Sequence, residues 1–209
     1  MSVIDRLACK QERNDEAPNI ELADYLFQNN DATGIKEIVD GLKETDRAVA
    51  NDCIKVLYEL GERNPKLISG YANEFVTYLH SKNNRLAWGS MTALAKIADY
   101  AANEIYEQLN IVKSAYENGS VITVDNSISV FAKLCKADCR YAETVLPILI
   151  NHLKKCKPKE VAQHAERASE CFNKNNAGAF IEALESRLTH LTSSQQARIN
   201  KLLKKLRTF

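Results

Sequence analysis

The sequence predicts an all-α protein, a right-handed superhelical solenoid of about five helical hairpins with an N-terminal half-repeat. Apolar residues recur every 37 residues along the chain, and two of these columns are Leu42/Leu79/Tyr116/Leu153 and Ile54/Met91/Ile128/Ala165. Within each repeat, further apolar residues follow at spacings of three, which is helical and leaves no competing strand alternation.

Each repeat is predicted to contain two helices. The first helices cover residues 32–43, 66–81, 103–117, 140–155 and 177–190, and the second helices cover 47–62, 84–100, 121–136, 158–173 and 194–207. Turn signals such as Asn64-Pro65, Gly119-Ser120 and Lys157-Pro158 fall between them. Ser193 and Gln196 predict a capping box at the start of the last helix.

The ends of the chain are predicted to differ from the central repeats. Residues 19–28 form the half-repeat, so that 19–209 is one solenoid domain, and residues 1–18 form a flexible or short helical arm. In the last helix, Leu202, Leu203 and Leu206 face the preceding repeat and the basic residues face outward. A polar outer face on a terminal repeat is what keeps a solenoid soluble.

Composition indicates an ordinary globular protein, with 45% hydrophobic and 26% charged residues. The N-terminus lacks a signal-peptide pattern, and no stretch is long and apolar enough to span a bilayer. The six cysteines stand singly on helical patterns, which favours reduced thiols and a cytoplasmic location. Nothing in the sequence predicts a cofactor.

Charge is distributed unevenly. Residues 1–64 hold 8 Lys/Arg against 14 Asp/Glu, residues 65–138 hold 7 against 7, and residues 139–209 hold 13 against 6. The alternatives are a functional dipole along the solenoid or solvated outer faces that differ by chance. A head-to-tail contact between the two ends would be weak, so we expect a monomer at physiological salt.

Two runs carry a family resemblance. FVTYLHSKNNRLAWGSMTALAKIA (75–98) and IVDGLKETDRAVANDCIKVLYELG (38–61) resemble HEAT repeats of the armadillo-type superfamily. The chain departs from that pattern in its first helices, where the expected proline is approximated only by Pro147. The resemblance implies scaffolds, transport receptors and regulatory subunits, and therefore interaction with another protein.

Motifs for catalysis or metal binding are weak. No P-loop, GxGxxG, HExxH or GxSxG pattern occurs. Cys135-x3-Cys139-x12-His152-x3-Cys156 has the spacing of a small zinc module, but His152 would lie about 20 Å along a helix from Cys139. The sequence therefore predicts packing cysteines, a surface histidine and no metal. Glu160 and His164 lie four residues apart without a neighbouring nucleophile.

The second helices are expected to line the inner, concave groove. Trp88, the only tryptophan, stands there in a polar column and is a candidate interface anchor, or alternatively covers Met91. The predicted groove residues are Arg85, Trp88, Thr92, Lys96, Asp125, Ser129 and Lys133. Lys96 and Lys133, flanked by Glu59 and Glu170, form either an inter-repeat ion ladder or a binding patch.

These observations predict a non-enzymatic scaffold or adaptor that binds a protein or peptide in the groove. The alternative is a HEAT-like enzyme on nucleic acid, of the alkylated-base DNA glycosylase type, which the near-zero net charge and the lack of a basic stripe disfavour. A third reading is a scaffold whose C-terminal helix binds an anionic partner through Arg198, Lys201, Lys204 and Lys205.

Overall fold

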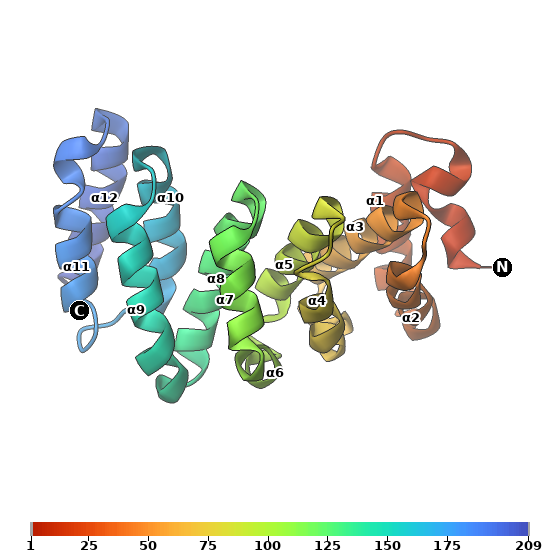
Figure 1. Cartoon of the computed structure of the whole chain (residues 1–209), viewed down its shortest axis with the longest axis horizontal. Coiled ribbons are helices and arrows are strands. Elements are labelled where there is room, and N and C mark those ends of the chain that lie inside the picture. Colours follow the sequence, from red (N-terminus) through yellow and green to blue (C-terminus); the bar gives the residue numbers. More distant parts are fainter. Residues whose placement is uncertain (1, 209) are drawn as a thin grey trace. The chain divides into compact units, whose positions relative to one another are not determined.

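The computed structural model describes residues 2–208, and every regular element in that range is a helix (Figure 1). The chain forms two compact units, which divide between Ser127 and Ile128 within helix α8 (Val121–Ala137). None of the helices in this range is long and apolar enough to cross a membrane.

The first unit contains two short 3-10 helices followed by three helical hairpins or parts of them. Its elements are η1 (Val3–Arg6), η2 (Ala8–Gln11), α1 (Ala17–Gln28), α2 (Ala32–Asp40), η3 (Gly41–Lys43), α3 (Arg47–Arg63), η4 (Pro65–Leu67), η5 (Ser69–Tyr71), α4 (Ala72–Tyr78), α5 (Asn84–Ile97), α6 (Ala102–Glu107), α7 (Leu109–Asn118) and the start of α8. The second helices pack side by side, α1 against α3 and α3 against α5. The first helices cover them from the other side, α2 on α3 and α4 on α5.

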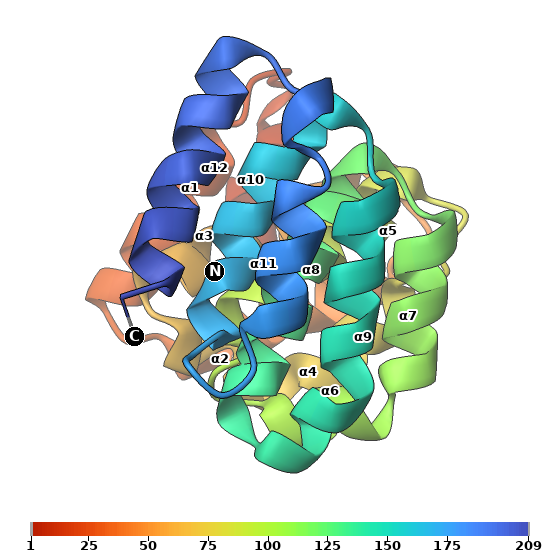
Figure 2. The same ribbon diagram turned by 90° about the vertical axis from the view of Figure 1, so that its left-hand side faces the viewer.

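The second unit contains the end of α8 and two hairpins. Its further elements are α9 (Cys139–Lys155), α10 (Pro158–Ala168), η6 (Ser169–Cys171), α11 (Gly178–Glu185), η7 (Leu188–His190) and α12 (Ser193–Leu206). The helices α9, α10, α11 and α12 lie side by side (Figure 2), with α9 packed on α11 and α10 packed on α12.

The repeated apolar columns form the core of both units. Three columns on the second helices are buried throughout: Ile54/Met91/Ile128/Ala165, Leu57/Leu94/Phe131/Ala168 and Leu60/Ile97/Leu134/Cys171. A column on the first helices is also buried throughout: Ile38/Phe75/Val112/Leu149. Each helix buries one apolar stripe against the helices of neighbouring repeats, which is the packing that the 37-residue period predicts.

Short polar side chains set where the helices begin. Asp46, Asn83 and Asp138 accept hydrogen bonds from backbone N–H groups in the first turns of α3, α5 and α9. A cap of this kind stabilises a helix by about 0.5–2 kcal/mol. The capping box of α12 uses Thr192 and Gln195, so the predicted Ser193 and Gln196 pair was wrong by one residue.

The first helices of the second and third repeats are less regular than predicted. The range 66–81 contains η4, η5 and α4, and the range 103–117 is divided into α6 and α7 at Gln108. In contrast, α9 continues through Pro147, although a proline inside a helix removes one backbone hydrogen bond.

The residues before the half-repeat helix α1 pack onto the helices of the first unit. Leu7 is fully buried, the Ala8 N–H donates to Asn19 Oδ1 at 3.0 Å, and the Cys9 N–H donates to Asp52 Oδ2 at 2.8 Å. This segment contains the short 3-10 helices η1 and η2. The half-repeat helix α1 begins at Ala17, two residues before the predicted start.

Candidate functional site

An aromatic pair lies on the second helices of the first unit. Tyr58 on α3 and Trp88 on α5 are both half-buried, with ring centroids 6.0 Å apart and ring planes tilted by 41°. A cation lies over each ring: Lys55 Nζ is 4.9 Å from the Tyr58 centroid, and Arg85 Cζ is 5.6 Å from the Trp88 centroid. Trp88 therefore stands in contact with a second aromatic side chain and with charged groups on its own face.

An ionic network joins these cations to the N-terminal segment. Lys55 Nζ lies 2.9 Å from Glu16 and 2.8 Å from Glu59, and Arg85 pairs with the other oxygen of Glu16. Burial of Lys55 disfavours its charged form, but the hydrogen bonds to Glu59 and Glu16 outweigh burial and raise the pKa of Lys55. Burial likewise disfavours ionised Glu16, yet Lys55 and Arg85 lower the pKa of that carboxyl. Lys55 and Glu16 are therefore both charged at neutral pH.

A cleft of about 470 Å³ adjoins this network and shares Arg85 with it. The cleft lies between the N-terminal segment and the helices α3 and α5, and its ionisable lining is Glu12, Arg13, Asp15, Glu16, Asp52 and Arg85. Four carboxylates against two guanidinium groups make the cleft acidic, and Arg13 is paired with Asp15 at 2.9 Å. The first unit as a whole carries 13 Lys/Arg against 20 Asp/Glu, a net charge of −7.

The predicted groove residues divide between the two units. Arg85, Trp88, Thr92, Lys96 and Asp125 belong to the first unit, whereas Ser129 and Lys133 belong to the second. All seven are half-buried.

Several of these groove residues hold helices together. The Thr92 hydroxyl donates to the Trp88 carbonyl at 2.8 Å and accepts from Asn126 Nδ2 at 3.0 Å, which ties α5 to α8. Lys96 pairs with Glu62 on α3. The ladder hypothesis assigned Glu59 to this position, but Glu59 pairs with Lys55 and Arg63 on its own helix.

Reasoning from the sequence missed Glu16 and the role of Lys55. The repeat register predicts that Lys55 faces outward in a column with Thr92 and Ser129, but its side chain is only 6% exposed. Glu16 lies 39 residues before Lys55, in a segment whose sequence carries no repeat signal. Only the packing of that segment onto α3 brings the two charges together.

The basic residues of the last helix are exposed, as predicted. Arg198, Lys201, Lys204 and Lys205 lie on the outer side of α12, while Ile199, Leu202, Leu203 and Leu206 are buried. Arg198 donates two hydrogen bonds to Glu166 on α10, at 2.9 and 2.6 Å, and lowers the pKa of that carboxyl. A depression of about 260 Å³ beside them is lined by Glu166, Arg198, Lys201, Leu202 and Lys205.

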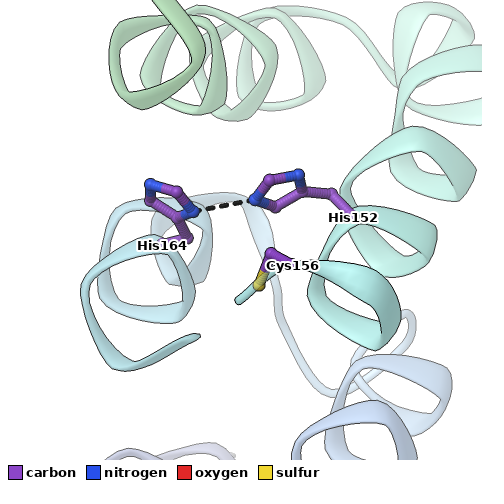
Figure 3. Close-up of side chains that lie close together, drawn as sticks. All are labelled: His152, Cys156 and His164. Carbon is purple, nitrogen blue, oxygen red and sulfur yellow. Dashed lines mark hydrogen bonds between the residues drawn. The ribbon is translucent and has the colours of Figure 1, made fainter. Parts of the chain in front are cut away.

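Two histidines meet inside the second unit. His152 on α9 and His164 on α10 are buried, and His152 Nε2 lies 2.8 Å from His164 Nδ1 (Figure 3). The prediction that His152 is a surface histidine was therefore wrong. Glu160, expected beside His164, accepts a hydrogen bond from the Lys157 N–H and caps α10.

The four residues of the predicted zinc spacing, Cys135, Cys139, His152 and Cys156, lie in two separate places in the second unit. Cys135 and Cys139 line a cavity of about 330 Å³ together with Cys171, whereas Cys156 lies beside the two histidines. Cys135 is buried and packs as predicted, but Cys139 is exposed. Burial raises the pKa of Cys156 to about 11, against the opposite effect of the nearby Arg187 guanidinium.

Comparison with protein-family models gives no match, and comparison with curated proteins gives none either. Solved structures do match. An engineered protein of the Northeast Structural Genomics Consortium superposes with a TM-score of 0.69 at 17% identity, over 100% of this chain and 98% of that one. A designed armadillo repeat protein in complex with the peptide (KR)4 superposes with a TM-score of 0.69 at 15% identity, over 88% and 85%.

A third match comes from a structure concerning a phosphorylation switch in the interaction between cadherin and beta-catenin. It superposes with a TM-score of 0.58 at 16% identity, over 95% of this chain and 43% of that one. These similarities confirm the predicted fold class: the chain has an all-α helical-repeat fold like that of the designed armadillo repeat proteins. At such identities they establish the fold alone.

Proposed function

We propose that this chain is a protein-binding scaffold whose first unit binds a basic, extended peptide segment of a partner. The observation that carries the proposal is the half-buried Tyr58/Trp88 pair beside an acidic cleft. Aromatic side chains that are partly exposed and held by neighbouring contacts are the residues that most often dominate binding energy at protein interfaces.

The charges favour a cationic partner. The cleft has more carboxylates than guanidinium groups, and the first unit carries a net charge of −7. A lysine or arginine of the partner would place its charged end among the carboxylates of the cleft. The designed armadillo repeat protein that superposes on this chain was solved with such a peptide, (KR)4, which is consistent with this chemistry.

The ionic network would keep the binding face in place before the partner arrives. Glu16 holds Lys55 and Arg85 from the side of the N-terminal segment, and those two cations lie over Tyr58 and Trp88. A face that is ordered in advance loses less conformational entropy on binding. Electrostatic attraction would mainly raise the association rate, so the affinity should fall as salt increases.

The single tryptophan provides a direct test. Trp88 lies on the proposed face, so its intrinsic fluorescence should change when (KR)4 is titrated into the protein, and an acidic peptide of the same length should leave it unchanged. Tyr58→Ala should weaken (KR)4 binding by about tenfold or more, because it removes half of the aromatic face. Glu12→Gln should weaken binding by a smaller factor and reduce its salt dependence, because it removes one cleft carboxylate.

The matched control is Tyr100→Ala, which removes an exposed tyrosine outside this face. Equal losses for Tyr58→Ala and Tyr100→Ala, in variants with unchanged circular dichroism, would exclude the aromatic pair as the binding face. Equal affinity for the basic and acidic peptides would exclude the cleft as its electrostatic part.

The proposal extends to the second unit as a separate, basic surface. It carries 15 Lys/Arg against 7 Asp/Glu, and the exposed cations of α12 lie beside the apolar edge of Leu202. An acidic partner segment fits this surface. The rival glycosylase hypothesis is disfavoured by the net charge of −7 on the unit that contains Trp88, since DNA binding needs cations to neutralise phosphates.

A further inference from the structure

The two facing histidines in the second unit resemble a pair of metal ligands in their placement. They come from adjacent antiparallel helices, His152 from the last turn of α9 and His164 from α10, and their ring nitrogens face each other at 2.8 Å (Figure 3). Both side chains are buried, with 7% and 1% exposed. Neutral imidazole nitrogen is the commonest metal ligand among side chains, so the two facing ring nitrogens present a pair of ligand atoms.

A third soft ligand stands beside the pair. Cys156 follows His152 by four residues, at the C-terminal cap of α9, and the three ligand atoms of His152, Cys156 and His164 all lie within 4.8 Å of one another. Among the residues that the structure describes, this is the group of histidine, cysteine and carboxylate side chains close enough to hold a metal ion.

We propose that His152, Cys156 and His164 bind one Zn²⁺ ion, with water as the fourth ligand. Imidazole nitrogen and thiolate sulfur are the ligands that zinc prefers in proteins. Three protein ligands leave one position open, and because Cys156 is only half-buried, solvent can reach that side of the site.

The side chains need only small movements to reach zinc geometry. Tetrahedral Zn–N bonds of about 2.0–2.1 Å place two nitrogens roughly 3.3 Å apart, so the histidine nitrogens must separate by about 0.5 Å. Figure 3 shows the Cys156 sulfur directed away from the facing nitrogens, so the thiol must also rotate about its Cα–Cβ bond. That rotation replaces a weak hydrogen bond from Cys156 Sγ to the Leu153 carbonyl, at 3.8 Å.

Arg187 holds the backbone at this point. Its guanidinium donates to the Leu153 carbonyl and to the Cys156 carbonyl, each at 2.7 Å, and so fixes the end of α9. Burial raises the pKa of Cys156 and so opposes the thiolate that zinc requires, whereas the Arg187 charge favours the thiolate but disfavours a nearby cation. A bound ion would link α9 to α10 and stabilise the folded form by mass action.

Cobalt provides the test, because Co²⁺ occupies zinc sites and a thiolate ligand adds a charge-transfer band to its spectrum. Apoprotein prepared with chelator should bind one equivalent of Co²⁺ with that band, and Zn²⁺ should displace the Co²⁺ and raise the melting temperature. Cys156→Ser should abolish the band and weaken metal binding by about tenfold or more, and His164→Gln should have the same effect.

Cys139→Ser is the matched control, since it alters an exposed cysteine of the same unit outside the cluster. It should retain the band and the affinity. Circular dichroism of each apoprotein shows whether it is folded. If His164→Gln does not fold, the result for Cys156→Ser alone tests the proposal. The proposal is overturned if folded wild-type protein binds no stoichiometric metal, or if the band is absent. It also fails if the band survives Cys156→Ser or disappears in Cys139→Ser.

Discussion

Gly89 on α5 packs against Ile54 on α3, one residue after Trp88. A Cβ added at Gly89 would lie 2.7 Å from Ile54 Cγ1 and 3.1 Å from Ile54 Cγ2. Ile54 is fully buried on α3, and its β-branched side chain has one strongly preferred rotamer in a helix. The neighbour therefore has little freedom to move aside.

We predict that Gly89→Ala destabilises the protein by about 1 kcal/mol. Carbon atoms pack at about 3.5–4.0 Å, so the two helices must separate by roughly 1 Å to admit the methyl group. Overpacking of this kind costs about 1–3 kcal/mol, whereas replacing glycine with alanine inside a helix gains about 1 kcal/mol. The steric cost is expected to exceed the gain.

The effect of Gly89→Ala on stability should change sign when Ile54 is truncated. In an Ile54→Ala background both γ carbons are absent, so Gly89→Ala should stabilise the protein by up to about 1 kcal/mol. Urea unfolding followed by Trp88 fluorescence measures both effects in the first unit. The control is Gly70→Ala in the same unit, where an added Cβ would meet no atom within 4 Å. A stabilising Gly89→Ala in the wild-type background, or additive effects of the two substitutions, would refute the steric argument.

Three further outcomes are expected. In urea unfolding, Leu94→Ala should lower the free energy of unfolding by about 2–5 kcal/mol. Leu203→Ala should lower it less, because the last helix packs against neighbours on one side only. Equal losses for the two variants would contradict nearest-neighbour packing. Burial opposes ionisation of Glu16 and Glu59, but hydrogen bonds from their basic partners hold both pKa values below 4.5. The two ionised carboxylates therefore stabilise the fold fully above pH 4.5, and this stabilisation is lost as the pH falls through their lower pKa values in the folded protein. On acidification, the free energy of unfolding of Glu16→Gln should fall less than that of the wild type. Sedimentation equilibrium should show a monomer at physiological salt and at most weak association at low salt, whereas a salt-insensitive dimer would mean that apolar contacts drive assembly.

The sequence alone determined the second helices of the repeats and the core. Four of the five repeats place an apolar residue at the positions equivalent to Ile54, Leu57 and Leu60, and all of these residues are buried. Four copies of one pattern support each other, so a substitution in one repeat does not obscure the register. The repeat register also places Trp88 on the face of α5 that carries polar residues in the other repeats.

Only the tertiary structure decided which distant side chains meet. Glu16 reaches Lys55 because it directly precedes α1, and α1 packs onto α3. His152 meets His164 because the turn between α9 and α10 directs both rings to the same side. Each residue along a helix rotates the side-chain direction by about 100°, so the angle of a turn and the rotation of a helix decide whether two side chains face each other. Those two quantities depend on the packing of the whole unit, and residue spacing does not encode them.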